Sequence, residues 1–145
     1  MAKKAPISRS MILENSPSVI MATCEQVVSE LKANGFDEDS IFGVHLSLNE
    51  ALINALNHGN KNDPAREIEL DYLITADRIE ISVADQGKGF DPDAVPDPRR
   101  EENLYKGVGR GLLLIRSYMN VVEFNDRGNR VRMVRHKGKQ PQMLA

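Results

Sequence analysis

The sequence predicts an α/β (α+β) two-layer sandwich, in which a mixed, mainly antiparallel sheet is covered on one face by helices. The first observation behind this prediction is that apolar residues recur at helical spacing in three segments, which begin near Ser16, Asp37 and Gly109. The second is that shorter segments between and after these helices alternate apolar and polar residues with a period of two, as strands do. With 145 residues, the chain is long enough to bury a single core.

Near the N-terminus we expect a loose tail, a short strand over residues 10–13 and then a helix. Ser16 is the expected cap of this helix, and its apolar residues repeat at helical spacing over residues 19–31. The pair Asn34-Gly35 is predicted to end it, because Asn and Gly adopt the backbone conformations that close a helix.

A second helix is predicted to begin near Asp37 or Asp39, which are both plausible caps, and to run to about His58. Gly59 then stands where a left-handed residue often ends a helix. The apolar face of this helix consists of Ile41, Val44, Leu48, Leu52 and Ala55.

The second half of the chain is predicted to contain two strand pairs, with a loop and a helix between them. Residues 68–74 and 78–83 have the alternation of an antiparallel hairpin. The segment 85–106 is rich in Gly, Pro and charge without periodicity, which is typical of a functional loop. The remaining elements are a helix over residues 107–120 and strands over residues 121–125 and 130–134.

Composition excludes several classes of protein. A net charge of −2 with 41% hydrophobic and 28% charged residues is typical of a globular domain and argues against a nucleic-acid binder. The only cysteine, Cys24, excludes an internal disulfide and is expected to be a small buried residue. No window reaches the roughly 18 apolar residues of a membrane span, and polar residues interrupt the N-terminal segment where a signal peptide would lie. We therefore expect a cytoplasmic protein that binds neither nucleic acid nor membranes.

The first unusual motif is NEALINALNHGN, residues 49–60, which places four asparagines in a predicted helix although asparagine is a poor helix former. At 100° per residue, Glu50, Asn54 and Asn57 share the side opposite the apolar face. A solvated face would explain this stripe, but such faces usually carry Lys, Glu and Arg. Short amides and one carboxylate also suit a hard cation bound through oxygen.

The second motif, VADQGKGF, ends a predicted strand with Asp85 and two glycines, Gly87 and Gly89. Glycines allow close approach of the backbone, so a flat ligand could lie there while the Asp85 carboxylate accepts a hydrogen bond from an amino group. An ordinary turn is the alternative. A calcium loop is excluded, because Pro96 occupies the twelfth position counted from Asp85.

The third motif, GVGRGLLLI, places Gly107, Gly109 and Gly111 at the start of a predicted helix. Free N–H groups at a helix N-terminus form an anion site that phosphate can approach closely where glycines stand. A Rossmann fingerprint is excluded because Leu112 replaces its third glycine, and a P-loop is excluded because no Gly-Lys-Ser/Thr follows.

In this order, the three motifs resemble the Bergerat-type ATP-binding fold shared by histidine kinases, type II topoisomerases and heat-shock chaperone ATPases. Within that superfamily the sequence looks most like the small anti-sigma-factor serine/threonine-protein kinases. The resemblance covers about residues 11–135 and leaves no room for the dimerisation and phosphoacceptor helices of a complete histidine kinase. It implies one histidine kinase-like ATPase domain over residues 10–137, with tails over residues 1–9 and 138–145.

The resemblance also implies roles for individual residues. Glu50 would act as the general base, and Asn54 would coordinate Mg²⁺ bridging the phosphates of ATP. Asp85 would accept a hydrogen bond from the adenine amino group. Cations of the long loop could reach the γ-phosphate or simply be solvated: Arg99, Arg100 and Lys106. The full set of expected cofactor-binding residues is Asn54, Asn57, Asp85, Gly87, Gly89, Phe90, Gly107, Gly109, Arg110, Gly111 and Leu112.

Two positions need separate comment, one histidine and one residue of the last hairpin. His58 matches the family's first motif, but a lone histidine at a helix end is more often structural than a ligand. Similar proteins often carry threonine after the glycine of the last hairpin, where its hydroxyl helps to hold adenine. In this chain Gly128 is followed by Asn129 and Arg130, which departs from the pattern at one adenine contact.

The function implied by the resemblance is an ATP- and Mg²⁺-dependent serine/threonine kinase that phosphorylates a small anti-anti-sigma-type protein and sequesters a sigma factor. One alternative is a nucleotide-gated interaction switch, which would bind ATP or ADP without phosphoryl transfer; the presence of Glu50 favours transfer. Another is a detached histidine-kinase catalytic domain. Homodimerisation is a family expectation.

Overall fold

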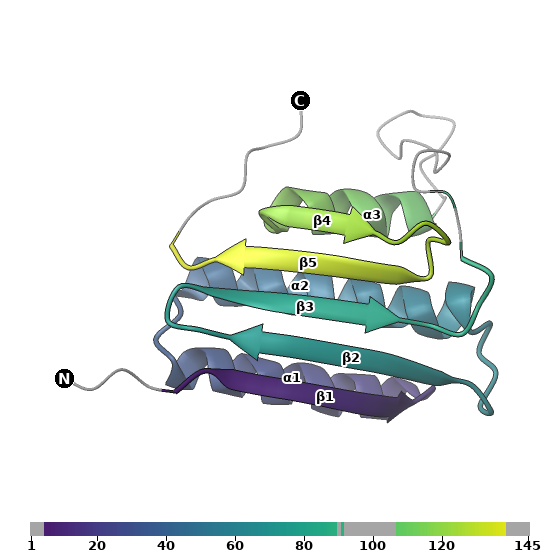
Figure 1. Cartoon of the computed structure of the whole chain (residues 1–145), viewed down its shortest axis with the longest axis horizontal. Coiled ribbons are helices and arrows are strands. Elements are labelled where there is room, and N and C mark those ends of the chain that lie inside the picture. The colour runs from purple at the N-terminus through teal and green to yellow at the C-terminus, as the bar shows by residue number, and fades with distance from the viewer. Residues whose placement is uncertain (1–4, 90, 92–106, 139–145) are drawn as a thin grey trace.

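The computed structural model describes residues 5–89, 91 and 107–138. Helices lie on one side of a five-stranded sheet with the order β1-β2-β3-β5-β4 (Figure 1). The strands are β1 (Ile7–Glu14), β2 (Glu67–Ile74), β3 (Arg78–Ala84), β4 (Val121–Phe124) and β5 (Arg130–His136). The helices are α1 (Pro17–Ala33), α2 (Glu38–Asn54), the π-helical turn η1 (Ala55–Gly59) and α3 (Gly107–Tyr118).

The predicted two-layer sandwich is confirmed, with one refinement in the sheet. The four strand pairings of the described residues are all antiparallel, so this part of the chain contains no parallel pair of the kind that a mixed sheet would have. Strand β1 is longer than the predicted segment 10–13, because it pairs along its whole length with β2, from Ile7 opposite Ile74 to Glu14 opposite Glu67.

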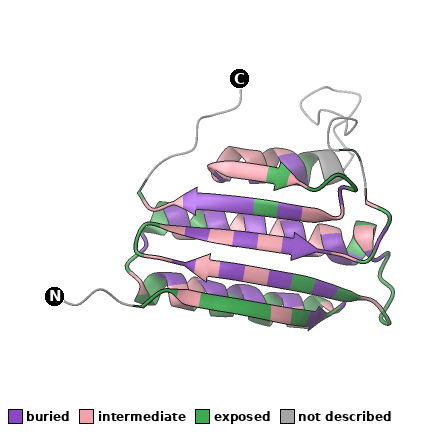
Figure 2. Ribbon diagram, in the orientation of Figure 1, coloured by how far each residue is buried: buried purple, intermediate pink, exposed green. Residues whose placement is uncertain are grey.

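Strands β2 and β3 form where the sequence alternates apolar and polar residues. The apolar residues face the helices and are buried, while the alternate residues face the open side of the sheet (Figure 2). On that open face, Arg130 contacts Glu69 at 2.6 Å and Arg132 contacts Glu80 at 2.5 Å. The Arg132 pair joins the neighbouring strands β5 and β3, and the Arg130 pair reaches across β3 to β2, on a face that no helix of the described residues covers.

The two long helices begin close to the predicted residues, and the predicted residues Ser16 and Asp37 both occupy N-cap positions. Asp37 caps α2, because its carboxylate accepts a hydrogen bond from the Ser40 N–H at 3.0 Å. Ser16 is the N-cap residue of α1 but its side chain makes no capping bond; its hydroxyl lies 3.0 Å from that of Ser18. Pro17 occupies the first turn of α1, where its missing N–H costs nothing.

The end of the second helix differs from the prediction. After Asn54 the chain continues as the π-helical turn η1, and Asn60 is its C-cap. Gly59 is not left-handed as predicted; in the segment that follows η1, Lys61 and Asn62 have positive φ, at 51° and 59°. Gly59 is required for a different reason, which is the close approach of Asp85 described below.

The core lies between the sheet and the helices. Val44, Leu48 and Leu52 of α2 are buried against the inner face of the sheet. Cys24 of α1 is 2% exposed, as predicted for a small buried residue, and burial raises the pKa of its thiol to about 11. Among the described residues, no helix has the length and apolar character needed to cross a bilayer.

Candidate functional site

The N-terminal part of α3 packs directly on the polar stripe of α2. A Cβ atom built on Gly111 would lie 2.8 Å from Oε2 of Glu50 and 3.1 Å from Nδ2 of Asn54, closer than real Cβ atoms normally come to either atom. Glycine therefore lets the opening of α3 approach these two side chains. Glu50 and Asn54 are both partly exposed, so they remain accessible beside this helix start.

Asp85 follows β3 and packs between two glycines. A Cβ atom on Gly59 would lie 2.2 Å from the Asp85 carboxyl carbon, and one on Gly87 would lie 2.2 Å from the carbonyl oxygen of Gly59. The N–H of Gly87 donates to Oδ1 of Asp85 at 2.8 Å. Both glycines thus allow η1 and the segment after β3 to approach closely, because a Cβ atom at either position would clash.

Electrostatics at Asp85 reflect this packing. Burial raises the pKa of its carboxyl above the ordinary value, while the hydrogen bond from Gly87 and the charge of Arg66 act in the opposite direction. The side chain is only partly buried. Asp85 is thus a carboxylate with a reduced water shell, which suits it to accept a hydrogen bond from a ligand amino group.

The backbone around Asp85 is held by the hairpin between β4 and β5. The Asp85 N–H donates to the carbonyl oxygen of Asn129 at 2.9 Å, and Nδ2 of Asn129 lies 3.4 Å from the Asp85 carbonyl oxygen. Gly89 has a φ of +83°, and a Cβ atom there would lie 1.7 Å from the carbonyl oxygen of Arg127. The second glycine of the motif therefore serves packing under this hairpin.

The side chain of Asn129, at the position where similar proteins often carry threonine, is used within the hairpin. Its Oδ1 accepts from Nδ2 of Asn125 at 2.7 Å, and Oδ1 of Asn125 accepts from the Asn129 N–H at 3.0 Å. The amide thus orders the turn that supports Asp85.

The remaining predicted site residues are spread over the two helices and the loop. Asn57 and Arg110 are exposed, Leu112 is buried, and Gly107 and Gly109 lie in the first turn of α3. Some predictions lie outside the described residues: Phe90, Arg99, Arg100 and Lys106. His58 is exposed, and no group of three or more metal-ligating His, Cys, Asp or Glu side chains occurs in the described part of the chain.

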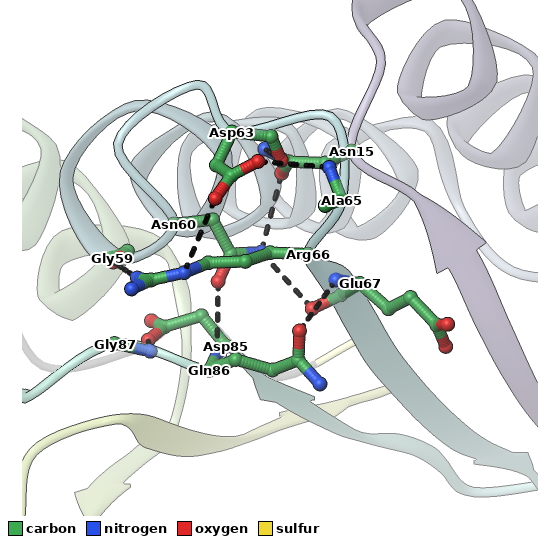
Figure 3. A network of polar contacts seen from close by, with 10 residues as sticks. All are labelled: Asn15, Gly59, Asn60, Asp63, Ala65, Arg66, Glu67, Asp85, Gln86 and Gly87. Atoms are coloured by element: carbon green, nitrogen blue, oxygen red, sulfur yellow. Dashed lines mark hydrogen bonds and ion pairs between the residues drawn. The ribbon is translucent and has the colours of Figure 1, made fainter.

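Sequence reasoning missed a polar network behind Asp85 (Figure 3). Its centre is Asn60, the fourth amide of the unusual stretch, which is fully buried. Arg66 also belongs to it, since one guanidinium N–H donates to the Gly59 carbonyl oxygen at 3.3 Å and the group lies 3.8 Å from Asp63. The partners of Asn60 are distant in sequence, so local pattern could not predict them. The only local signal for Asn60 was that it continues the series of asparagines.

A cavity of about 360 Å³ lies near this region but is separate from the meeting point of α2 and α3. It is lined on the open side of the sheet by paired residues such as Ile12 and Glu69, and by the hairpin residues Asn125 and Arg127. Asp85 and Gln86 of the second motif also line it, whereas Glu50, Asn54 and Gly111 do not. Asp85 therefore borders both this cavity and Gly59 on the helix side.

Comparison with known proteins adds an independent finding. The model of the histidine kinase-like ATPase domain family matches residues 13–135, most of the chain. A relative from Oceanobacillus iheyensis named serine-protein kinase RsbW is 32% identical over 98 residues, which cover 63% of this chain and 62% of that protein. A Bacillus subtilis protein of the same name is 29% identical over 125 residues, covering 81% of this chain and 76% of that protein. A Listeria monocytogenes protein of the same name is 29% identical over 109 residues, covering 70% and 69%. The match with the Oceanobacillus protein thus spans less than two thirds of that protein's length.

Proposed function

Because the chain belongs to the histidine kinase-like ATPase domain family, we propose that it is an ATP-dependent protein serine/threonine kinase. In this proposal its substrate is a small anti-anti-sigma-type protein, and it can also sequester a sigma factor. The names of the relatives, serine-protein kinases, support phosphoryl transfer to serine. A cytoplasmic location, where ATP is available, is part of the same proposal.

The observation that carries the proposal is the contact of Gly111 with Glu50 and Asn54. It places a carboxylate and an amide beside the N-terminus of α3, where free N–H groups favour phosphate. A pure nucleotide-binding module needs the anion site but has no use for a base next to it. The pairing of the two therefore favours transfer over binding alone.

In the proposed reaction, the Glu50 carboxylate accepts the proton of the attacking serine hydroxyl. The serine oxygen forms a bond to the γ-phosphorus while the bond to the β–γ bridging oxygen breaks, and ADP leaves. Such reactions depend mainly on positioning and on stabilising charge. General bases typically contribute about 10²–10⁴-fold to such rates.

In this proposal the segment after β3 binds the base of the nucleotide, and the N-terminal end of α3 binds its phosphates. Asp85 accepts a hydrogen bond from the adenine amino group, and Gly87 and Gly89 shape the base pocket. The backbone at the N-terminal end of α3, at Gly107, Gly109 and Gly111, faces phosphate. Arg110 lies in the first turn of this helix and Leu112 in the second.

The donor set at α2 fits a magnesium ion carried by ATP. Magnesium prefers oxygen ligands and usually takes only one or two from the protein, the rest being phosphate and water. Asn54 offers an amide oxygen next to the opening of α3, and Asn57 follows it one turn later. When bound, Mg²⁺ supplies charge neutralisation for the phosphates.

The test is a quenched single-turnover assay with purified protein, Mg²⁺-ATP and a small anti-anti-sigma-type protein. We expect phosphoserine or phosphothreonine on the partner, and we expect Glu50→Gln to retain ATP binding while losing transfer. Phosphohistidine on the partner would instead identify a detached histidine-kinase domain. ATP binding without any transfer would overturn the kinase proposal and leave a nucleotide-gated switch.

A further inference from the structure

Asn60 closes the π-helical turn η1 with its backbone alone. Its N–H donates to the Ala55 carbonyl oxygen at 2.7 Å, and its own carbonyl oxygen accepts from the Asp63 N–H at 3.0 Å. The residue has 0% of its surface exposed. Since the turn is complete without it, the side-chain amide is free to act elsewhere.

That side chain joins three segments that are distant in sequence (Figure 3). Its Nδ2 donates to the carbonyl oxygen of Glu67, the first residue of β2, at 2.9 Å and to Oδ1 of Asn15, just after β1, at 3.2 Å. Its Oδ1 accepts from the Gln86 N–H, just after β3, at 2.8 Å. A buried amide with donor and acceptor both used fixes the relative position of the groups that it joins.

The bond to Gln86 matters because the peptide between Asp85 and Gln86 is a rigid plane. Holding the Gln86 N–H therefore holds the point from which the Asp85 side chain departs. The Gln86 side chain adds a second restraint, since its Oε1 accepts from the Glu67 N–H at 2.8 Å. Gly59, the neighbour of Asn60, contacts the Asp85 carboxyl itself.

We propose that Asn60 is a positioning residue that fixes the Asp85 carboxylate for recognition of the nucleobase amino group. The inference rests on the proposed function, because it assumes that Asp85 reads adenine. Asn60 is fully buried and does not touch the ligand; it positions Asp85 through its hydrogen bond to the Gln86 N–H. Its loss should therefore reduce discrimination between bases more than it reduces binding of the phosphates at α3.

A first experiment tests the hydrogen bond without any nucleotide. Hydrogen exchange of the Gln86 amide is measured in the wild-type protein, in Asn60→Ala and in the control Asn120→Ala. Asn120 is a matched control, because its Oδ1 also accepts a backbone N–H at 2.8 Å, that of His136 at the other end of the sheet. We expect Gln86 to exchange at least about tenfold faster in Asn60→Ala and at the wild-type rate in Asn120→Ala.

A second experiment measures base selectivity. The dissociation constants of ATP and of purine riboside triphosphate, which lacks the amino group, are compared by calorimetry for the same three proteins. A hydrogen bond to a charged group should favour ATP by about tenfold or more in the wild type. We expect this ratio to fall towards one in Asn60→Ala and to be kept in Asn120→Ala, even if both variants unfold at lower temperature.

A milder variant covers the case in which Asn60→Ala does not fold. Gln86→Ala removes only the hydrogen bond between the exposed Gln86 side chain and the Glu67 N–H. It should also lower the selectivity ratio, but by a smaller factor than Asn60→Ala. Wild-type selectivity in the folded variants, with normal ATP binding by the wild type, would overturn the inference while leaving the proposed function intact. Absence of ATP binding by the wild type would overturn the proposed function and, with it, the inference.

Discussion

Replacing Gly59 with alanine should damage nucleotide binding through a contact that is visible in the free protein. The added Cβ would lie 2.2 Å from both Cγ and Oδ2 of Asp85 and 2.6 Å from Oδ1. Ordinary contacts begin near 3.4 Å, so the carboxyl group must move by roughly 1 Å. Such a movement breaks the 2.8 Å hydrogen bond from Gly87 and misplaces the acceptor proposed for adenine.

The expected magnitude follows from the interaction that is lost. Hydrogen bonds to charged groups are worth about 1.5–3 kcal/mol, so ATP affinity should fall by about 10- to 150-fold. Stability should change less, because Gly59 has no positive φ and alanine gains about 1 kcal/mol of helix propensity against an overpacking cost of about 1–3 kcal/mol.

The assay is calorimetric titration with ATP, alongside thermal unfolding. Gly43→Ala is the matched control, since it lies in α2 with a Cβ contact of 3.3 Å to Tyr118, far from Asp85. In a double-mutant cycle, Gly59→Ala should add little to the loss caused by Asp85→Asn, because both act on the same carboxyl. Wild-type affinity in folded Gly59→Ala, or full additivity in the cycle, would refute this reasoning.

Three other predictions concern the same groups. Glu50→Gln should keep the ATP dissociation constant and lower single-turnover transfer by at least about 100-fold, as expected for loss of a general base; equal transfer would remove that role. Gly111→Ala should displace the Glu50 carboxylate, 2.8 Å from the new Cβ, and lower transfer more than affinity, with rates and dissociation constants measured on one preparation. The raised pKa of Asp85 means that the folded protein holds this proton more tightly than the unfolded chain, so the ionised carboxyl costs stability at neutral pH and the cost disappears as the pH falls through the raised value. Asp85→Asn without nucleotide should therefore unfold at a slightly higher temperature than the wild type at pH 7, by a margin that shrinks towards pH 4; a lower unfolding temperature at pH 7 would contradict this.

The parts of the fold that sequence predicted well are those set by local pattern. Alternation over β2 and β3 identified the hairpin and the buried face, and Asp37 was recognisable as a cap because its partner Ser40 is three residues away. Strand β1 was predicted too short, since its extent depends on pairing with β2, some sixty residues later.

The site shows the same division between local and distant causes. The stripe of Glu50 and Asn54 follows from helical spacing, but its contact with Gly111 depends on the packing of α3 on α2. Gly59 was interpreted as a left-handed helix end, the common reason for glycine at that position. Its actual constraint comes from Asp85, 26 residues further on, and no local rule could have predicted that contact.

The most direct test of the account is a titration of the wild-type protein and Asp85→Asn with ATP, with and without Mg²⁺. The account predicts binding in the micromolar range by the wild type, sensitive to Mg²⁺ and lost in Asp85→Asn. Absence of binding by the wild type, or equal binding by Asp85→Asn, would contradict it.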